Sequence, residues 1–156
     1  MEALAERDDT EALLSECLIF HALDSNGRRQ LASRVKHAHH FAGETIFSAG
    51  EPGRSMMIVA SGSVRVTLPT NGGDEITLAD FERGAVLGEI ALLDGRPRSA
   101  SATALTDCEL LLLDRTAIGP LLRSNTRACM AIIEMLCDRL RQADERMAIA
   151  GPAPDC

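Results

Sequence analysis

The sequence predicts a mainly β domain, either a sandwich or a barrel, with helices at both ends. Residues 35–114 contain short runs of β-forming residues separated by glycines. Many short strands spaced by about 8–12 residues are typical of sandwiches and barrels rather than of alternating β and α units. The regions before and after repeat apolar residues at intervals of three and four, as helices do. The length of 156 residues suits one domain with a single core.

The N-terminal segment, residues 1–34, is predicted to be helical. Within residues 9–34, the apolar residues that recur at helical spacing are Leu13, Leu14, Cys17 and Leu18. Residues 23–27 contain turn-forming types and should break the helix. A short second helix should then run from about residue 28 to residue 34, and Asp24 or Ser25 could cap it.

The central segment, residues 35–114, should hold the strands. We expect strands at residues 35–41, 45–47, 56–60, 64–68, 75–81, 100–105 and 108–113. Residues 70–74 read Thr-Asn-Gly-Gly-Asp, and this composition predicts a hairpin turn because Asn and Gly adopt positive φ at little cost.

The third segment, residues 115–150, is predicted to form two helices, at 116–123 and 126–148, before a Gly-Pro stop and a tail at 151–156. On the long helix, a heptad-like spacing of 4-3-4-3-4 links Cys129, Ile133, Leu136, Leu140, Ala143 and Met147. Two interpretations remain open: an amphipathic helix that covers the barrel, or the seam of a homodimer through residues 129–147. Ile132 and Met135 lie beside this seam and could pack on the β region.

Composition argues against several classes of function. The net charge is −7, Lys36 is the single lysine, and there is no Trp or Tyr, so direct nucleic-acid binding is not expected. No apolar run approaches the ~18 residues of a membrane span, and the acidic start does not resemble a signal peptide. Five cysteines without a C-x-x-C pair indicate reduced thiols and a cytoplasmic protein. Cys108, Cys129 and Cys137 lie in apolar stretches and are expected in the core.

Residues 87–100, Leu-Gly-Glu-Ile-Ala-Leu-Leu-Asp-Gly-Arg-Pro-Arg-Ser-Ala, are the most informative stretch. Gly88 precedes a short apolar turn whose first N–H groups lack partners within the turn, and such a start attracts anions. After the turn ends, Pro97 stiffens the return, so Arg98 can lie close to the same N–H groups. Arg and backbone amides together suit a phosphate. The Glu89 carboxylate could accept a hydrogen bond from a sugar hydroxyl. It would also repel a second negative charge on the ligand, and this favours a singly charged phosphodiester over a phosphomonoester. The alternative is a surface ion pair between Arg98 and Glu89.

This stretch resembles the phosphate-binding cassette of cyclic nucleotide-binding domains, which occur in catabolite-activator-type regulators, kinase regulatory subunits and nucleotide-gated channels. The shared pattern is Gly-Glu, an apolar Ala-Leu-type pair, a short loop, and then Arg, a small residue and Ala. Residues 43–47, 50–51 and 57–64 also match the glycine-bounded strands of the family, and the resemblance covers roughly residues 12–148. It implies a double-stranded β-helix (jelly roll) of about eight strands. It also implies a non-catalytic sensor of cAMP or cGMP in which the ligand repositions the C-terminal helix.

The resemblance also assigns roles to individual residues. Glu89 would bind the ribose 2′-hydroxyl and Arg98 the cyclic phosphate. The sugar-phosphate would lie against Gly88 and the amides of Ile90 and Ala91. Ser99 would lie near the phosphate or, with a syn guanine, near the base amino group. The pocket-lining positions of the family fall on Val66, Leu78 and Phe81, for which plain barrel core is the alternative. The purine-contacting helix positions fall on Ala143 and Asp144, which leave the choice of purine open.

The sequence also allows interpretations other than the sensor. The chain could be the regulatory fragment of a larger channel, cyclase or Crp-like transcription factor, since about eight residues follow the long helix where such regulators carry a helix-turn-helix. Otherwise an unknown protein effector would read the signal. A ligand-free structural domain is disfavoured because Glu89 and Arg98 are both present. A cupin-like metalloenzyme is suggested by histidines at positions 37, 39 and 40 followed by Glu44. However, Leu31 replaces the expected glycine, and the second histidine motif is missing.

Overall fold

The computed structural model describes Thr10 and residues 12–21 and 23–150. Within these residues, eight strands form two antiparallel four-stranded sheets, with the orders β1-β8-β3-β6 and β2-β7-β4-β5. The strands are β1 (Lys36–His40), β2 (Thr45–Phe47), β3 (Ser55–Ser61), β4 (Val64–Pro69), β5 (Glu75–Phe81), β6 (Val86–Leu87), β7 (Ser101–Ala104) and β8 (Cys108–Asp114). The predicted fold class, a mainly β roll with flanking helices, is confirmed.

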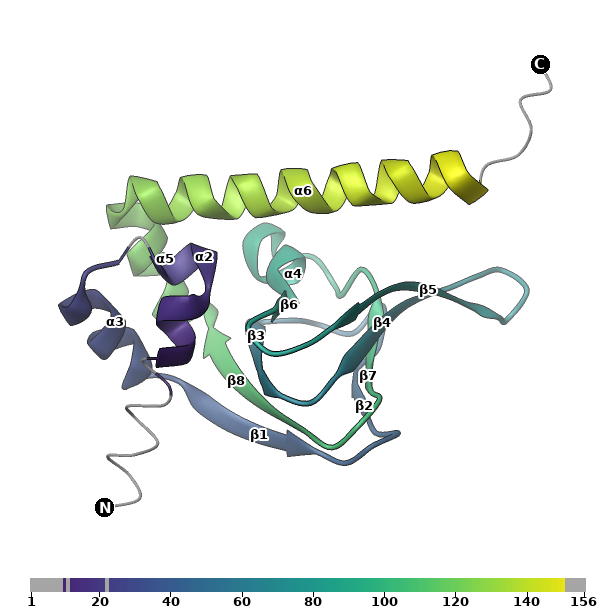
Figure 1. The fold of residues 1–156 in the computed structure, drawn as a ribbon, viewed down its shortest axis with the longest axis horizontal. Helices are drawn as coiled ribbons and strands as arrows, with labels where there is room; N and C mark the ends of the chain where they lie inside the picture. The colour runs from purple at the N-terminus through teal and green to yellow at the C-terminus, as the bar shows by residue number, and fades with distance from the viewer. Residues whose placement is uncertain (1–9, 11, 22, 151–156) are drawn as a thin grey trace.

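The glycine-bounded strand pattern located most strands to within a residue or two. Strands β2 and β5 have the predicted bounds, whereas the two-residue strand β6 was not predicted. The hairpin turn between β4 and β5 closes where its composition placed it: the Thr70 N–H donates to the Asp74 carbonyl at 2.8 Å, and Gly73 has a φ of +86°. This hairpin projects from the end of the roll that lies away from α2 and α3 (Figure 1).

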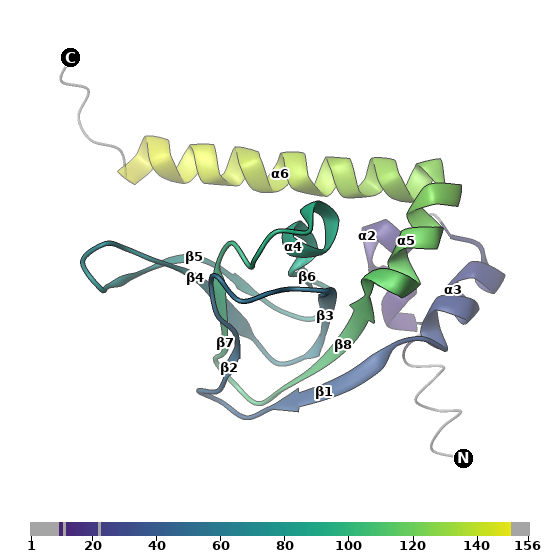
Figure 2. The same cartoon turned by 180° about the vertical axis from the view of Figure 1, so that it is seen from behind.

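The helices lie at one end and along one side of the roll. They are α2 (Leu18–His21), α3 (Ser25–Ala32), α4 (Glu89–Asp94), α5 (Arg115–Ser124) and α6 (Thr126–Ala150), and residues 12–16 are also helical. Helix α3 begins earlier than predicted because the Asp24 side chain caps it, accepting from the Gly27 N–H at 2.7 Å. Figures 1 and 2 both show α6 crossing the molecule above α4, with α2, α3 and α5 gathered near its first half.

The buried apolar residues form two clusters. One lies between the N-terminal helices, α5, α6 and the first sheet, and contains Leu13, Phe20, Ile58, Leu113 and Ile118 among others. The second fills the roll between the two sheets and contains Phe47, Val59, Val64, Ala102 and Leu110 among others. The α4 residue Leu92 belongs to the first cluster, so the segment around residues 88–98 is attached to the core that α6 covers.

Helix α6 has two apolar faces, one packed on the domain and one exposed, and the homodimer seam stays a prediction. Ile132 is buried, and Met135 and Leu136 pack on the core, so one face covers the domain. Ile133 and Leu140 are 50% and 65% exposed. Of the predicted seam, Leu136 therefore belongs to the covering face.

The prediction that Cys137 is a core residue was wrong. Cys137 is exposed on α6, whereas Cys108 is buried and Cys129 is partly buried. The segments 1–9 and 151–156 and the side chains of Leu18 and Met147 lie outside the described residues. None of the helices in the described part of the chain combines the length and apolar character of a membrane span.

Candidate functional site

The segment from β6 to β7 carries the residues predicted to bind the ligand. Strand β6 pairs with β3, Leu87 lying opposite Met57, and this pairing brings the chain to Gly88 at the start of α4. Gly88 adopts a left-handed φ of +75° and no side chain caps the helix at this position. Gly95 ends α4 with a φ of +71°. The predicted short turn after Gly88 is therefore present, with its first amides uncapped by any side chain.

Arg98 returns to the start of this turn, as predicted. The residue is only 7% exposed, and its Nη1 donates to the carbonyls of Ser55 at 2.9 Å and Gly88 at 3.1 Å. Its guanidinium carbon lies 4.5 Å from the centre of the Phe47 ring. Burial lowers the pKa of Arg98, and the nearby charges of Glu51 and Glu89 act in the opposite direction. Arg98 remains a cation, held by carbonyl groups and an aromatic ring.

Glu89 is the second buried charge of the segment, with 3% of its surface exposed. Its carboxylate forms an ion pair with Arg139 of α6, which also donates to the Val86 carbonyl. The Arg139 guanidinium lies 5.1 Å from the centre of the Phe81 ring. The alternative prediction, a surface ion pair between Arg98 and Glu89, was wrong, because Glu89 is buried and pairs with a different arginine.

Arg139 is the site residue that sequence reasoning missed. It lies four residues after Met135 and seven after Ile132, both of which had been predicted to pack on the β region. Residues at these spacings share one face of a helix. The same spacing therefore predicts that Arg139 lies on the face of the helix that packs on the roll, where a buried carboxylate would attract it.

The other predicted site residues differ in their surroundings. Near the start of α4, Ala91 is buried and Ile90 is 43% exposed, and Ser99 is exposed beside Arg98. Val66 and Phe81 pack partly buried against the core of the roll, whereas Leu78 is 37% exposed on β5. The plain core interpretation is therefore wrong for Leu78. The two positions expected near a purine, Ala143 and Asp144, are exposed on α6.

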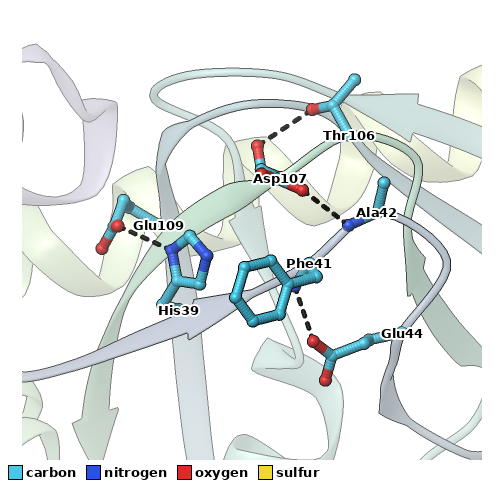
Figure 3. Close-up of polar contacts among 7 residues, drawn as sticks. All are labelled: His39, Phe41, Ala42, Glu44, Thr106, Asp107 and Glu109. Carbon is cyan, nitrogen blue, oxygen red and sulfur yellow. Dashed lines mark hydrogen bonds and ion pairs between the residues drawn. The ribbon is translucent and has the colours of Figure 1, made fainter.

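The histidine motif lies on β1, on the side of the roll away from α6 (Figure 1), and its His39 and Glu44 take part in local contacts (Figure 3). His39 Nδ1 lies 2.8 Å from the Glu109 carboxylate. The imidazole and the Phe41 ring are arranged edge to face, with their centroids 4.7 Å apart. Glu44 accepts from the Phe41 N–H at 2.8 Å and so closes the turn after β1. In the described part of the chain, no group of three or more His, Cys, Asp or Glu side chains is placed to hold a metal ion.

The eight-stranded roll with flanking helices and two buried charges beside one turn defines a class of β-roll domain, and sequence comparison identifies the family. A sequence model of the cyclic nucleotide-binding domain matches residues 38–125, so the chain belongs to this family. The chain is 37% identical over 126 residues to a Thermus thermophilus cyclic AMP receptor protein, covering 81% of this chain and 58% of the relative. It is 32% identical over 120 residues to a cAMP-dependent protein kinase regulatory subunit of Aspergillus niger, covering 77% of this chain and 28% of the relative.

Solved structures agree with this assignment. The Thermus thermophilus catabolite activator protein superimposes with a TM-score of 0.75 at 36% identity, covering 85% of this chain and 62% of that one. A cyclic nucleotide-binding domain from Methylobacillus flagellatus has the same fold, with a TM-score of 0.81 at 21% identity over 96% of this chain and 86% of that one. The chain spans less than two thirds of the length of the curated relatives described above.

Proposed function

We propose that this domain is a non-catalytic sensor that binds a cyclic nucleotide at residues 88–99. Arg98 would bind the cyclic phosphate together with the amides of Ile90 and Ala91, and Glu89 would accept from the ribose 2′-hydroxyl. The observation that carries this proposal is the burial of two opposite charges, Glu89 and Arg98, beside one uncapped helical turn. Charged side chains are rarely buried unless they are paired or have a function, and Arg98 is held by neutral carbonyl groups.

The relatives favour cAMP as the first ligand to test, because the names of the bacterial and fungal proteins above refer to cyclic AMP. The second ligand to test is cGMP, because the residues of α6 that would meet the base do not select between the two purines. Ala143 has no side-chain hydrogen-bonding group, and an ionised Asp144 accepts without donating, so it could accept from a purine amino group. Ser99 beside Arg98 could serve either nucleotide.

Arg139 supplies a physical link between this site and α6. It pairs with the Glu89 carboxylate that the ribose hydroxyl would use. A ligand that bonds to Glu89 must share this carboxylate with Arg139 or displace it, and either change alters what holds α6 on the roll. Helix α6 is therefore the element whose position the nucleotide would bias.

The exposed apolar face of α6 supports the homodimer as the route by which the signal leaves the domain. Met130, Ile133 and Leu140 are each at least 49% exposed and recur at near-heptad spacing. A Leu140→Glu variant should shift the protein to a monomer in analytical ultracentrifugation, and a monomeric wild-type chain would instead favour a separate protein effector.

Calorimetric titration with cAMP and cGMP tests the proposal. Wild-type protein should bind at least one of them, and Arg98→Ala should lose about 2–5 kcal/mol of binding free energy because a desolvated phosphate loses its partner. Arg34→Ala is the control: it removes an exposed arginine that lies outside residues 88–99 and should bind as wild type. Arg98→Ala protein that binds as tightly as wild type would rule out this role for Arg98.

A further inference from the structure

Arg98 lies against a part of the chain that precedes the cassette by about forty residues. We propose that the segment 47–55 is a seat that fixes the Arg98 guanidinium for phosphate recognition, and that Phe47 and Gly53 are its positioning residues. This inference rests on the proposed function, since it names residues outside the cassette that orient the phosphate-binding group.

Gly53 leaves the guanidinium room that any larger residue would occupy. A Cβ atom added at Gly53 would lie 2.5 Å from Nε, 2.7 Å from Cζ and 2.8 Å from Cδ of Arg98, and these are the three nearest heavy atoms. Because the three distances are nearly equal, that Cβ would lie over the plane of the guanidinium rather than along the Nε–H bond. Gly53 does not adopt a positive φ, so its backbone would accept alanine. The contact with Arg98 is therefore the specific reason for a glycine at this position.

The rest of the segment holds both the backbone and the side chain of Arg98. The Arg98 N–H donates to the Glu51 carbonyl at 2.8 Å, and the Gly50 N–H donates to the Arg98 carbonyl at 2.9 Å. Ser55 accepts from Nη1 at 2.9 Å. The Phe47 ring lies 4.5 Å from the guanidinium carbon and is itself 7% exposed, so core packing fixes the ring.

This seat leaves a defined edge of the guanidinium for a ligand. Both side-chain hydrogen bonds of Arg98 to the protein leave from Nη1 and end on the carbonyls of Ser55 and Gly88. The opposite edge, formed by Nε and Nη2, can bind two oxygens of a phosphate side on. Because Arg98 is buried and held on one side, little side-chain freedom would be lost on binding, and a fixed cation binds more tightly than a mobile one.

The first test measures nucleotide affinity. Gly53→Ala would push the guanidinium off its seat, so the Kd for cAMP or cGMP in calorimetry should rise by about tenfold or more, as for one lost charge-assisted hydrogen bond. Gly72→Ala is the matched control, because a Cβ there meets nothing within 4 Å and Gly72 does not need a positive φ. Unchanged affinity in Gly53→Ala would overturn the proposal.

The second test needs no nucleotide and separates the seat from the proposed function. Gly53→Ala should lower the midpoint of thermal unfolding in a chain with Arg98, but not in an Arg98→Ala chain, where the colliding group is gone. Phe47→Leu should likewise cost less stability in the Arg98→Ala background. An equal loss in both backgrounds would show that Gly53 and Phe47 affect stability independently of Arg98, and it would overturn the proposal. If wild-type protein bound neither nucleotide, the proposed function would fail while this thermal comparison still decided whether the seat exists.

Discussion

The ion pair between Glu89 and Arg139 should contribute measurably to stability, and its size can be worked from burial. The side chains of Glu89 and Arg139 are 4% and 27% exposed. Removing one partner from a fully buried pair costs roughly 3–5 kcal/mol, because it leaves an uncompensated buried charge. Water reaches part of Arg139, so we expect Arg139→Met to lower the free energy of unfolding by about 2–3 kcal/mol. For a domain of this size, the unfolding midpoint should fall by roughly 5–10 °C.

A double-mutant cycle isolates the pair from the other contacts of Arg139. Arg139→Met also removes the hydrogen bond to Val86 and the contact with Phe81, but these losses occur with Glu89 and with Glu89→Gln alike. The double variant should therefore be less destabilised than the sum of the single variants, by about 1.5–3 kcal/mol.

Chemical denaturation followed by circular dichroism at pH 7 gives these free energies. The control cycle uses Arg65→Met and Asp80→Asn, which break a pair whose side chains are both 42% exposed and should show a smaller coupling than Glu89 and Arg139. A coupling energy below about 0.5 kcal/mol for Glu89 and Arg139 would equal that of ordinary surface pairs. It would refute the argument that this contact attaches α6 to the site.

Two further predictions concern the scaffold. Burial raises the pKa of the Cys17 thiol from 9.0 to about 11, and the thiol donates to the Gly84 carbonyl. The unfolded chain therefore loses this proton first, so Cys17 should contribute about 2–3 kcal/mol of stability that disappears between pH 9 and 11. Urea denaturation across this range should show the loss in wild type and a flatter profile in Cys17→Ala. Gly62→Ala should destabilise the turn between β3 and β4 severely, because its φ is +87° and a Cβ would lie 2.3 Å from the Asp107 carbonyl oxygen. Gly73→Ala has the same kind of φ in open space and should lose only the left-handed strain of about 1–2 kcal/mol, so equal losses in urea denaturation would contradict the clash.

The sequence was sufficient for the parts of the fold that local rules decide. Strands β2 and β5 followed from β-forming runs between turn residues, and the Asp24 cap followed from residue type. Strand β6 was missed because two residues are too few to show a period, and its pairing with β3 is a tertiary contact. On α6, Leu136 and Cys137 are neighbours that face the core and solvent respectively. The helical period alone cannot assign two adjacent apolar positions to the core or to solvent, because the assignment depends on where the roll lies against α6.

The site divides in the same way. Glu89 and Arg98 could be predicted as binding residues because a local motif of about ten residues carries both. Arg139 joins Glu89 from 50 residues away, and Gly53 lies beside Arg98 although the two residues are far apart in the sequence. These partners depend on how the sheets and α6 are packed, so the motif that carries Glu89 and Arg98 does not report them.

The two buried charges are held by different parts of the molecule, and this difference suggests how binding and signalling could be separated. Arg98 is fixed by carbonyls and a ring that belong to the roll itself. Glu89 is fixed by a side chain of α6. A ligand that engages Arg98 alone would gain affinity while leaving α6 in place, because none of the contacts of Arg98 described above involves α6. Only a ligand that also engages Glu89 interacts with the ion pair that links the site to α6. The phosphate would therefore supply much of the affinity, and the ribose hydroxyl would supply much of the coupling between binding and the position of α6. A ligand can shift α6 only through a contact that differs between the two positions of the helix, and the contact with Glu89 is such a contact.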